Sequence, residues 1–277
     1  MNAYVTPKRR RLVKFAGASV VSLLILSGCS SFSGKSDQPA YKETPVATLY
    51  NNAADQLQKE NYAEAAKLFD EVERQHPYSV WATKAQLMAA YSLYMHNRYD
   101  QAINALDRFI QLHPANKDVP YAYYLKGLCY YEQISDVARD QQMTENAYAT
   151  LKELIARFPT SPYARDAKVK LDLTRDHMAG KEMEIGRYYL RKGEYLAAIN
   201  RFKRVIDEYQ TTTHTPEALL RLVEAYWALG LKAEARKVAA VLGYNFPGST
   251  WYGDAYRLVG GKKIGPTAQK NPWYKFW

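Results

Sequence analysis

Side chains that could carry out chemistry are few in this sequence, and their spacing matches no catalytic motif. The 277 residues include two cysteines and five histidines. There is no Gly-rich phosphate-binding loop, no Gly-x-Ser-x-Gly nucleophile turn, no His-Glu-x-x-His pair and no Cys/His spacing suited to zinc. A pair of carboxylates in a catalytic setting is also missing. We therefore expect a binding protein without enzyme activity, a metal or a cofactor.

Cys29 is the one nucleophile with a recognisable setting, because it follows the features of an export signal. Basic residues end at Lys14, an apolar run covers 15–26, and two small residues precede the cysteine. A transmembrane helix needs about 20 apolar residues, so this run is too short to remain as a membrane span. We expect residues 1–28 to be a cleaved signal peptide. Its loss would lower the formal net charge from +10 to about +5, which argues against nucleic acid as a partner.

The segment 26–29, with the sequence Leu-Ser-Gly-Cys, resembles the lipobox of bacterial lipoproteins. The resemblance implies that the Cys29 thiol receives a diacylglyceryl group and that its amino group is acylated after cleavage. Each buried CH2 of an acyl chain contributes about 0.8 kcal/mol, and two or more chains make anchoring stable. By the same resemblance, Ser30 favours transport to the outer membrane. The alternative is an ordinary secreted protein cut near Gly28, in which Cys29 is a coincidence.

The other cysteine and two of the histidines are better explained by packing than by reactivity. With Cys29 lipidated, Cys129 has no partner for a disulfide. Its neighbours are apolar and at helical spacing, which predicts a small buried hydrophobic side chain. His76 and His113 occupy a repeated position that aromatic residues fill elsewhere, so we expect them to be packing rings.

Composition divides the remainder of the chain into a tether, a helical part and a tail. Residues 29–44 contain Ser, Lys and Pro without an apolar period, which predicts a flexible tether. From residue 45 onward apolar residues recur at helical spacing without any Val/Ile-rich alternating strand, so the protein should be all-α. We divide this part into an N-terminal region, 45–178, and a C-terminal region, 179–260. The tail, 261–277, is basic and then aromatic, and we expect it to dock on a surface.

An internal repeat becomes visible when alanines that allow close helix approach are aligned. Each marker alanine is followed four residues later by an apolar residue and twelve residues later by a proline, except that Gln210 stands in the fourth repeat. A ring precedes the proline position, and a side chain suited to capping the next helix lies two residues after it. The markers are Ala65, Ala102, Ala147, Ala198 and Ala235, and the expected caps are Ser79, Asn116, Ser161, Thr212 and Ser249.

This pattern resembles the tetratricopeptide repeat, a pair of antiparallel helices. The resemblance implies a solenoid of about five divergent helix-turn-helix repeats with extra and capping helices. The marker spacings are 37, 45, 51 and 37 residues, whereas the consensus repeat has 34. The two long spacings predict extra residues around 135–145 in the third repeat and an additional helix over 162–177. A final helix over 251–258 should cap the stack.

Two groups of side chains are candidates for binding a partner. A basic row in the fourth repeat includes Arg187, Arg201 and Arg204, and it could either bind an acidic partner or form a solvated face. Tyr121 and Tyr124 belong to a tyrosine cluster in the third repeat. Core packing and peptide binding explain that cluster equally well, because tyrosine combines a large apolar ring with a polar tip.

Segments 106–114, 123–128 and 158–163 resemble the BamD family of outer-membrane lipoproteins. The resemblance implies a scaffold of the β-barrel assembly machinery that binds the POTRA region of BamA, other Bam lipoproteins and unfolded outer-membrane β-barrel proteins. It also implies a lipid anchor on the periplasmic face of the outer membrane and a contact between Arg201 and BamA. The aromatic tail departs from the family. The rival interpretations are a tetratricopeptide lipoprotein of the cell-wall or cell-division machinery and a cell-wall hydrolase.

Overall fold

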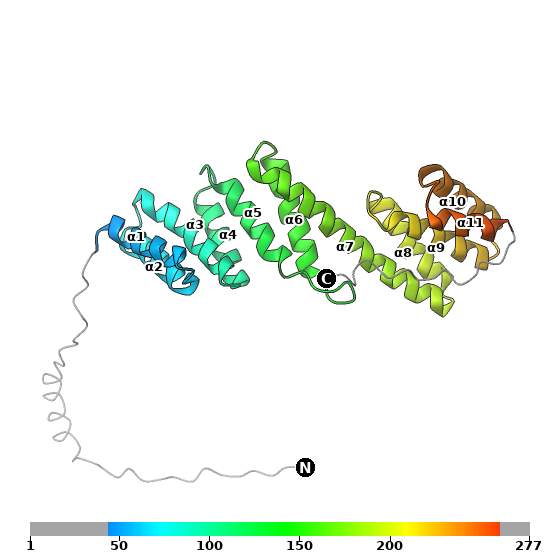
Figure 1. The fold of residues 1–277 in the computed structure, drawn as a ribbon, viewed down its shortest axis with the longest axis horizontal. Coiled ribbons are helices and arrows are strands. Elements are labelled where there is room, and N and C mark those ends of the chain that lie inside the picture. Colours follow the sequence, from blue (N-terminus) through cyan, green and yellow to red (C-terminus); the bar gives the residue numbers. More distant parts are fainter. Residues whose placement is uncertain (1–43, 261–277) are drawn as a thin grey trace, which may run out of the picture. The chain divides into compact units, whose positions relative to one another are not determined.

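The computed structural model describes residues 44–260, and this part of the chain consists of α-helices joined by turns and loops (Figure 1). The all-α prediction is confirmed for these residues, in which no strand occurs. None of the described helices is both long enough and apolar enough to cross a membrane. The predicted signal peptide, the lipidation site at Cys29, the tether up to residue 43 and the tail from residue 261 lie outside the described residues.

The described helices form five successive pairs and a final single helix, and each helix packs on the next one in the chain (Figure 1). This order confirms the predicted repeats and the predicted capping helix. The pairs are α1 (Val46–Gln58) with α2 (Tyr62–Gln75), α3 (Val80–Met95) with α4 (Tyr99–Leu112), α5 (Val119–Tyr131) with α6 (Gln142–Arg157), α7 (Pro162–Lys192) with α8 (Tyr195–Glu208) and α9 (Thr215–Ala228) with α10 (Lys232–Asn245), followed by α11 (Thr250–Val259).

Close approach of the two helices forms the core of each pair. All five marker alanines are fully buried on the second helix, and the apolar residues four positions later are buried beside them. A small residue on the first helix faces this row. A Cβ atom added to Gly186 would lie 2.4 Å from Cε1 of Phe202, and one added to Gly127 would lie 2.6 Å from Cδ2 of Leu151. The Phe202 ring therefore leaves no room for a larger residue at position 186, whereas a side chain at position 127 would require Leu151 to shift.

The turn between the two helices is the same in four of the five pairs. The residue five positions before the marker alanine has a positive φ: 60° at Glu60, 59° at Asn97, 78° at Gly193 and 77° at Gly230. The next N–H donates to the carbonyl five residues before it, at 2.8–3.0 Å. This is the left-handed helix ending that glycine adopts without steric cost. The third pair differs because the predicted extra residues are present, in the loop 132–141.

The second helix of each pair ends at the predicted ring side chain. All five rings have φ between −136° and −125°, outside the helical range. A following proline disfavours helical backbone, which explains four of the endings. The ring of His113 lies 5.3 Å from that of Phe109, and its Nε2 is 2.9 Å from Oε1 of Gln86, so the expected packing role of His113 is confirmed.

The capping prediction is right for two of the five side chains. Ser79 accepts a hydrogen bond from the N–H of Trp81 at 3.1 Å, and Ser249 accepts one from the first turn of α11. Asn116 instead closes the turn that precedes α5. The predictions for Ser161 and Thr212 are wrong: Ser161 Oγ has no partner among the described residues, and the Thr212 hydroxyl donates to the backbone behind it. Hydroxyl groups can bond to local carbonyls instead of capping a helix.

The additional helix predicted over 162–177 does not exist as a separate element. Helix α7 runs for 31 residues without a break, so its first half and the first helix of the fourth repeat are one helix (Figure 1). The boundary drawn between residues 178 and 179 therefore lies inside a helix. The reason is that the sequence from Pro162 to Lys192 contains no proline after the first position and its single interior glycines are tolerated in a helix.

Two loops pack against the middle of α7, where His177 and His214 are partly buried. Lys181 Nζ donates to the carbonyls of Ala138 and Arg139 at 3.1 and 3.2 Å, which fastens the loop 132–141 to the helix. His214, in the loop after α8, has its Nε2 3.6 Å from Oδ2 of Asp176. Burial lowers the pKa of His214 more than the Asp176 and Glu217 carboxylates raise it.

Gly186→Ala should destabilise the fold, because its methyl group would overlap the Phe202 ring. We expect a loss of about 1–3 kcal/mol in the free energy of unfolding, the usual range for overpacking. Gly253→Ala is the matched control, since a Cβ there meets nothing within 4 Å and alanine is the better helix former. Urea denaturation followed by circular dichroism measures both. Equal midpoints for the two variants would contradict the packing described here.

The free energy of unfolding should fall as the pH is lowered from about 7.5 to about 5.5. Burial lowers the pKa of both His177 and His214 below the ordinary value of 6.5, so the unfolded chain binds protons at a higher pH than the folded chain. The loss is at most about 1.4 kcal/mol per histidine for each pH unit. His214→Gln should flatten the pH dependence of the thermal midpoint, whereas His96→Gln, at an exposed position, should not. A dependence unchanged by His214→Gln would refute this assignment.

Candidate functional site

The fourth helix pair brings two of the predicted arginines together on one carboxylate. Arg201 and Arg204 lie one turn apart on α8, and each places a guanidinium nitrogen 3.0 Å from an oxygen of Glu182 on α7. The Glu182 side chain is only 10% exposed, whereas those of Arg201 and Arg204 are 37% and 47% exposed. The carboxylate therefore lies beneath the two cations and orients both toward the surface.

Arg204 also bonds to a second carboxylate, at the exposed end of α8. Its Nε donates to Glu208 at 3.0 Å. This hydrogen bond, together with the Glu182 charge, raises the pKa of the Arg204 guanidinium. Each arginine carries five N–H donors, and the recorded bonds occupy only part of them. The arginines can thus bind a further acceptor without leaving Glu182.

A surface hollow adjoins the arginine pair. It has a volume of about 310 Å³ and is lined by Tyr189, Ala197, Asn200, Arg201 and Arg204. Asn200 is exposed, and the aromatic ring of Tyr189 contributes an apolar wall. An arginine pair beside a ring is suited to a carboxylate or a backbone carbonyl of another protein, since charge-assisted hydrogen bonds are the strong ones.

Arg187 does not belong to the same face as the other two arginines. Its guanidinium bonds to Glu217 on α9 at 3.1 Å and to Glu184 at 3.3 Å. Glu217 also accepts from Arg221, at 3.3 Å, and the Arg221 guanidinium lies 5.7 Å from the centre of the Trp251 ring. Two ion pairs and one cation–π contact therefore connect Arg187 on α7 through α9 to Trp251 on α11. The predicted basic row is two separate groups.

Tyr121 and Tyr124 are bound within the fold rather than presented as a free surface. The Tyr163 ring of α7 lies 5.2 Å from that of Tyr121 and 5.4 Å from that of Tyr124, and the Tyr124 hydroxyl donates to Asp166. Burial raises the pKa of Tyr121, and burial and the Asp166 carboxylate raise that of Tyr124. These contacts between α5 and α7 favour the packing interpretation of the cluster.

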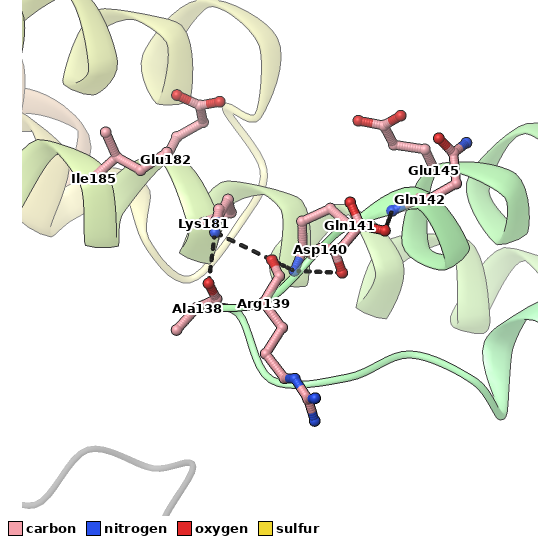
Figure 2. A pocket seen from close by; sticks show the side chains of 9 residues that line it. All are labelled: Ala138, Arg139, Asp140, Gln141, Gln142, Glu145, Lys181, Glu182 and Ile185. Carbon is pink, nitrogen blue, oxygen red and sulfur yellow. Dashed lines mark hydrogen bonds between the residues drawn. The ribbon is translucent and has the colours of Figure 1, made fainter.

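A second hollow is lined in part by Glu182, and Figure 2 shows its lining. Its volume is about 520 Å³, and it is bounded by the loop from Ala138, the start of α6 and the residues Lys181, Glu182 and Ile185 of α7. In Figure 2, Lys181 points to the loop carbonyls, while the Arg139 side chain extends away from Glu182. Glu182 thus lines this hollow and also holds the two arginines that line the other one.

Glu182 was not predicted from the sequence as a residue of this site. It lies among the buried residues Ala179, Gly180, Met183 and Gly186, and a carboxylate in such an apolar row was the available signal. Its partners are about one helix away in the chain, so their proximity could not be predicted from spacing. The described residues contain no cluster of ligands that could hold a metal ion.

Comparison with known proteins connects this geometry to a family. The sequence model of the YfiO family, described as an outer membrane lipoprotein, matches residues 42–242. A protein of Caulobacter vibrioides named outer membrane protein assembly factor BamD is 51% identical over 253 residues, which cover 91% of this chain and 83% of the relative. The assembly factor BamD of Rickettsia prowazekii is 50% identical over 249 residues, covering 90% of this chain and 98% of the relative. That of Neisseria meningitidis serogroup A is 34% identical over 266 residues, covering 92% and 96%.

Glu182→Gln should weaken the attachment of α8 to α7. Glutamine preserves the shape but removes the charge that holds both arginines, and we expect a loss of about 1–2 kcal/mol in the free energy of unfolding, discounted for the exposure of the arginines. Glu208→Gln is the control, because its carboxylate also pairs with Arg204 but is 53% exposed. Its effect should stay within about 0.5 kcal/mol. If Glu182→Gln and Glu208→Gln lose the same free energy of unfolding in chemical denaturation, Glu182 does not hold α8 to α7 more strongly than Glu208 does.

Proposed function

The chain belongs to the BamD family of outer membrane lipoproteins, and on this premise we propose that it is a non-enzymatic scaffold of the outer-membrane β-barrel assembly machinery. The observation that carries the proposal is the identity of about one half, over nine-tenths of the chain, with curated assembly factors. The helix pairs, whose exposed surfaces lie on rigid elements, support a binding role.

The proposed attachment to the membrane is a lipid on Cys29. A diacylglyceryl thioether and an N-acyl group would supply more than one acyl chain, which is sufficient for stable anchoring. About 15 residues separate this cysteine from Thr44, where the described part begins, and they would span at most about 50 Å when fully extended. This anchoring would place the helix pairs at the periplasmic face of the outer membrane.

The proposed site for the barrel subunit is the hollow beside Arg201 and Arg204. The POTRA region of BamA would offer carboxylates or backbone carbonyls to the guanidinium groups that Glu182 orients. Pre-orientation lowers the entropic cost of binding, because the long arginine side chains are already restrained in the free protein. Arg187 is a weaker candidate for this contact, because its side chain is 24% exposed, compared with 37% for Arg201 and 47% for Arg204. Other Bam lipoproteins would bind elsewhere on the scaffold.

The proposed cargo of the N-terminal helix pairs is unfolded outer-membrane β-barrel protein. Such chains expose extended segments rich in aromatic and apolar residues, and tyrosine-rich surfaces suit their recognition. Tyr130, Tyr131 and Tyr148 of the third pair are half-buried, and we assign their accessible parts to this recognition.

Asn200→Glu should reduce the amount of BamA that co-purifies from detergent-solubilised envelopes by about tenfold, which corresponds to about 1.4 kcal/mol. The substitution introduces a carboxylate into the hollow, where it repels an acidic partner, yet Asn200 is exposed and holds no recorded bond within the fold. It is a cleaner test than Arg201→Glu, which would place a second carboxylate beside Glu182 and disturb the fold.

Arg236→Glu, at an exposed position on α10, is the matched control and should leave the recovery of BamA unchanged. Circular dichroism should show the same helicity for both variants. Full recovery of BamA with Asn200→Glu would contradict the proposed contact.

A further inference from the structure

The turn between α2 and α3 exposes an unusual group of apolar side chains. Tyr78 is 101% exposed and Val80 is 85% exposed, and Pro77 beside them is also exposed. We call residues 77–80 the first-repeat tip. The sequence has no acidic residue from 77 to 84, and Lys84 follows Val80 by one helical turn. The tip is therefore apolar with a basic edge.

The other repeats lack this feature at the matching positions. Tyr78 directly follows the proline of the first repeat, whereas small residues follow the proline in the second, third and fifth repeats. At the position of Val80 these repeats have a polar residue or a proline. The packing of the helices therefore does not require large apolar side chains here. The matching residues are Ala115, Thr160 and Gly248 for Tyr78, and Lys117, Pro162 and Thr250 for Val80.

The described chain begins directly beside the tip. The N–H of Thr44 donates to Oε1 of Gln75 at 3.0 Å, and His76 Nε2 donates to the carbonyl of Thr44 at 2.7 Å. These two residues immediately precede Pro77. Thr44, the first described residue after Cys29, thus lies at the turn that carries Tyr78 and Val80.

We propose that the first-repeat tip is a membrane-contact surface that enters the interfacial region of the bilayer holding the lipid of Cys29. This inference rests on the proposed lipid anchor. Tyrosine suits the boundary between headgroups and acyl chains, valine adds apolar area, and the lysine edge suits anionic headgroups. Two apolar side chains alone bind a membrane weakly. A tether of about 15 residues raises the effective concentration of the bilayer at the tip, so that a weak contact is populated.

The test uses the full lipidated protein in vesicles of phosphatidylethanolamine and phosphatidylglycerol, with an environment-sensitive dye attached to Tyr78→Cys. Thr160→Cys, at the matching turn of the third repeat, is the control. Cys129 stays unlabelled in both variants, because it is fully buried and burial raises the pKa of its thiol to about 12. Dye emission and quenching by aqueous iodide are measured on vesicles recovered by flotation.

We expect the dye at position 78 to shift to shorter wavelength and to be quenched several-fold less by iodide than the dye at position 160. Equal quenching at both positions, with both proteins floating, would overturn the inference and leave the lipid anchor intact. Failure of the proteins to float would overturn the anchor and the inference together. Protection of position 78 in native envelopes but not in pure lipid vesicles would assign the tip to a protein partner and also overturn the inference.

A second pair of variants distinguishes membrane contact made by Tyr78 and Val80 from contact made by the attached dye. The dye on Lys84→Cys should show a smaller shift in the same direction, because the apolar side chains of Tyr78 and Val80 are kept while the basic edge is lost. The change of both Tyr78 and Val80 to serine should abolish that shift, because the apolar contact is removed while the exposed turn is kept. Persistence of the shift in the serine variant would refute the role of these two side chains.

Discussion

The continuity of α7 is the constraint on which the rest of the described structure depends. Its residue Ala167 belongs to the core that α5 and α6 help to form, whereas Ala179 and Met183 belong to the core beneath α8. At about 1.5 Å per residue the helix is about 46 Å long, and its backbone hydrogen bonds are internal. The spacing between the first three helix pairs and the last two is therefore set by one helix. A partner bound at the fourth pair and a cargo bound at the first three would be held at a fixed separation.

The middle of this helix also carries the charged and titratable groups that distinguish it from an ordinary packing element. Glu182 orients Arg201 and Arg204, Lys181 fastens the loop 132–141, and His214 lies over Gly180. A buried charge is costly unless it is paired, so Glu182 is better explained by what it positions than by its own contribution to stability. The proposed contact with the barrel subunit follows from this arrangement.

Much of the fold could be predicted from sequence because each repeat is marked by residues at fixed, short spacings along the chain. The marker alanines, the rings before the prolines and the apolar residues four positions later are all buried or helix-terminating as expected. The single helix α7 was missed, since a long marker spacing shows that residues are added but not whether the chain breaks. The site was only partly predictable for a related reason. Arg201 and Arg204 are neighbours on one helix, whereas their link to Glu182 and the separation of Arg187 depend on how helices pack.

In the proposed complex, the fourth helix pair binds the barrel subunit through the surface that Glu182 supports. The most direct measurement places a photo-crosslinking amino acid at Asn200 of the full-length protein, irradiates intact outer membranes and identifies the captured peptides by mass spectrometry. We expect crosslinks to the POTRA region of BamA from Asn200 and none from Arg236 on α10. Crosslinks to that region from Arg236, with none from Asn200, would contradict it.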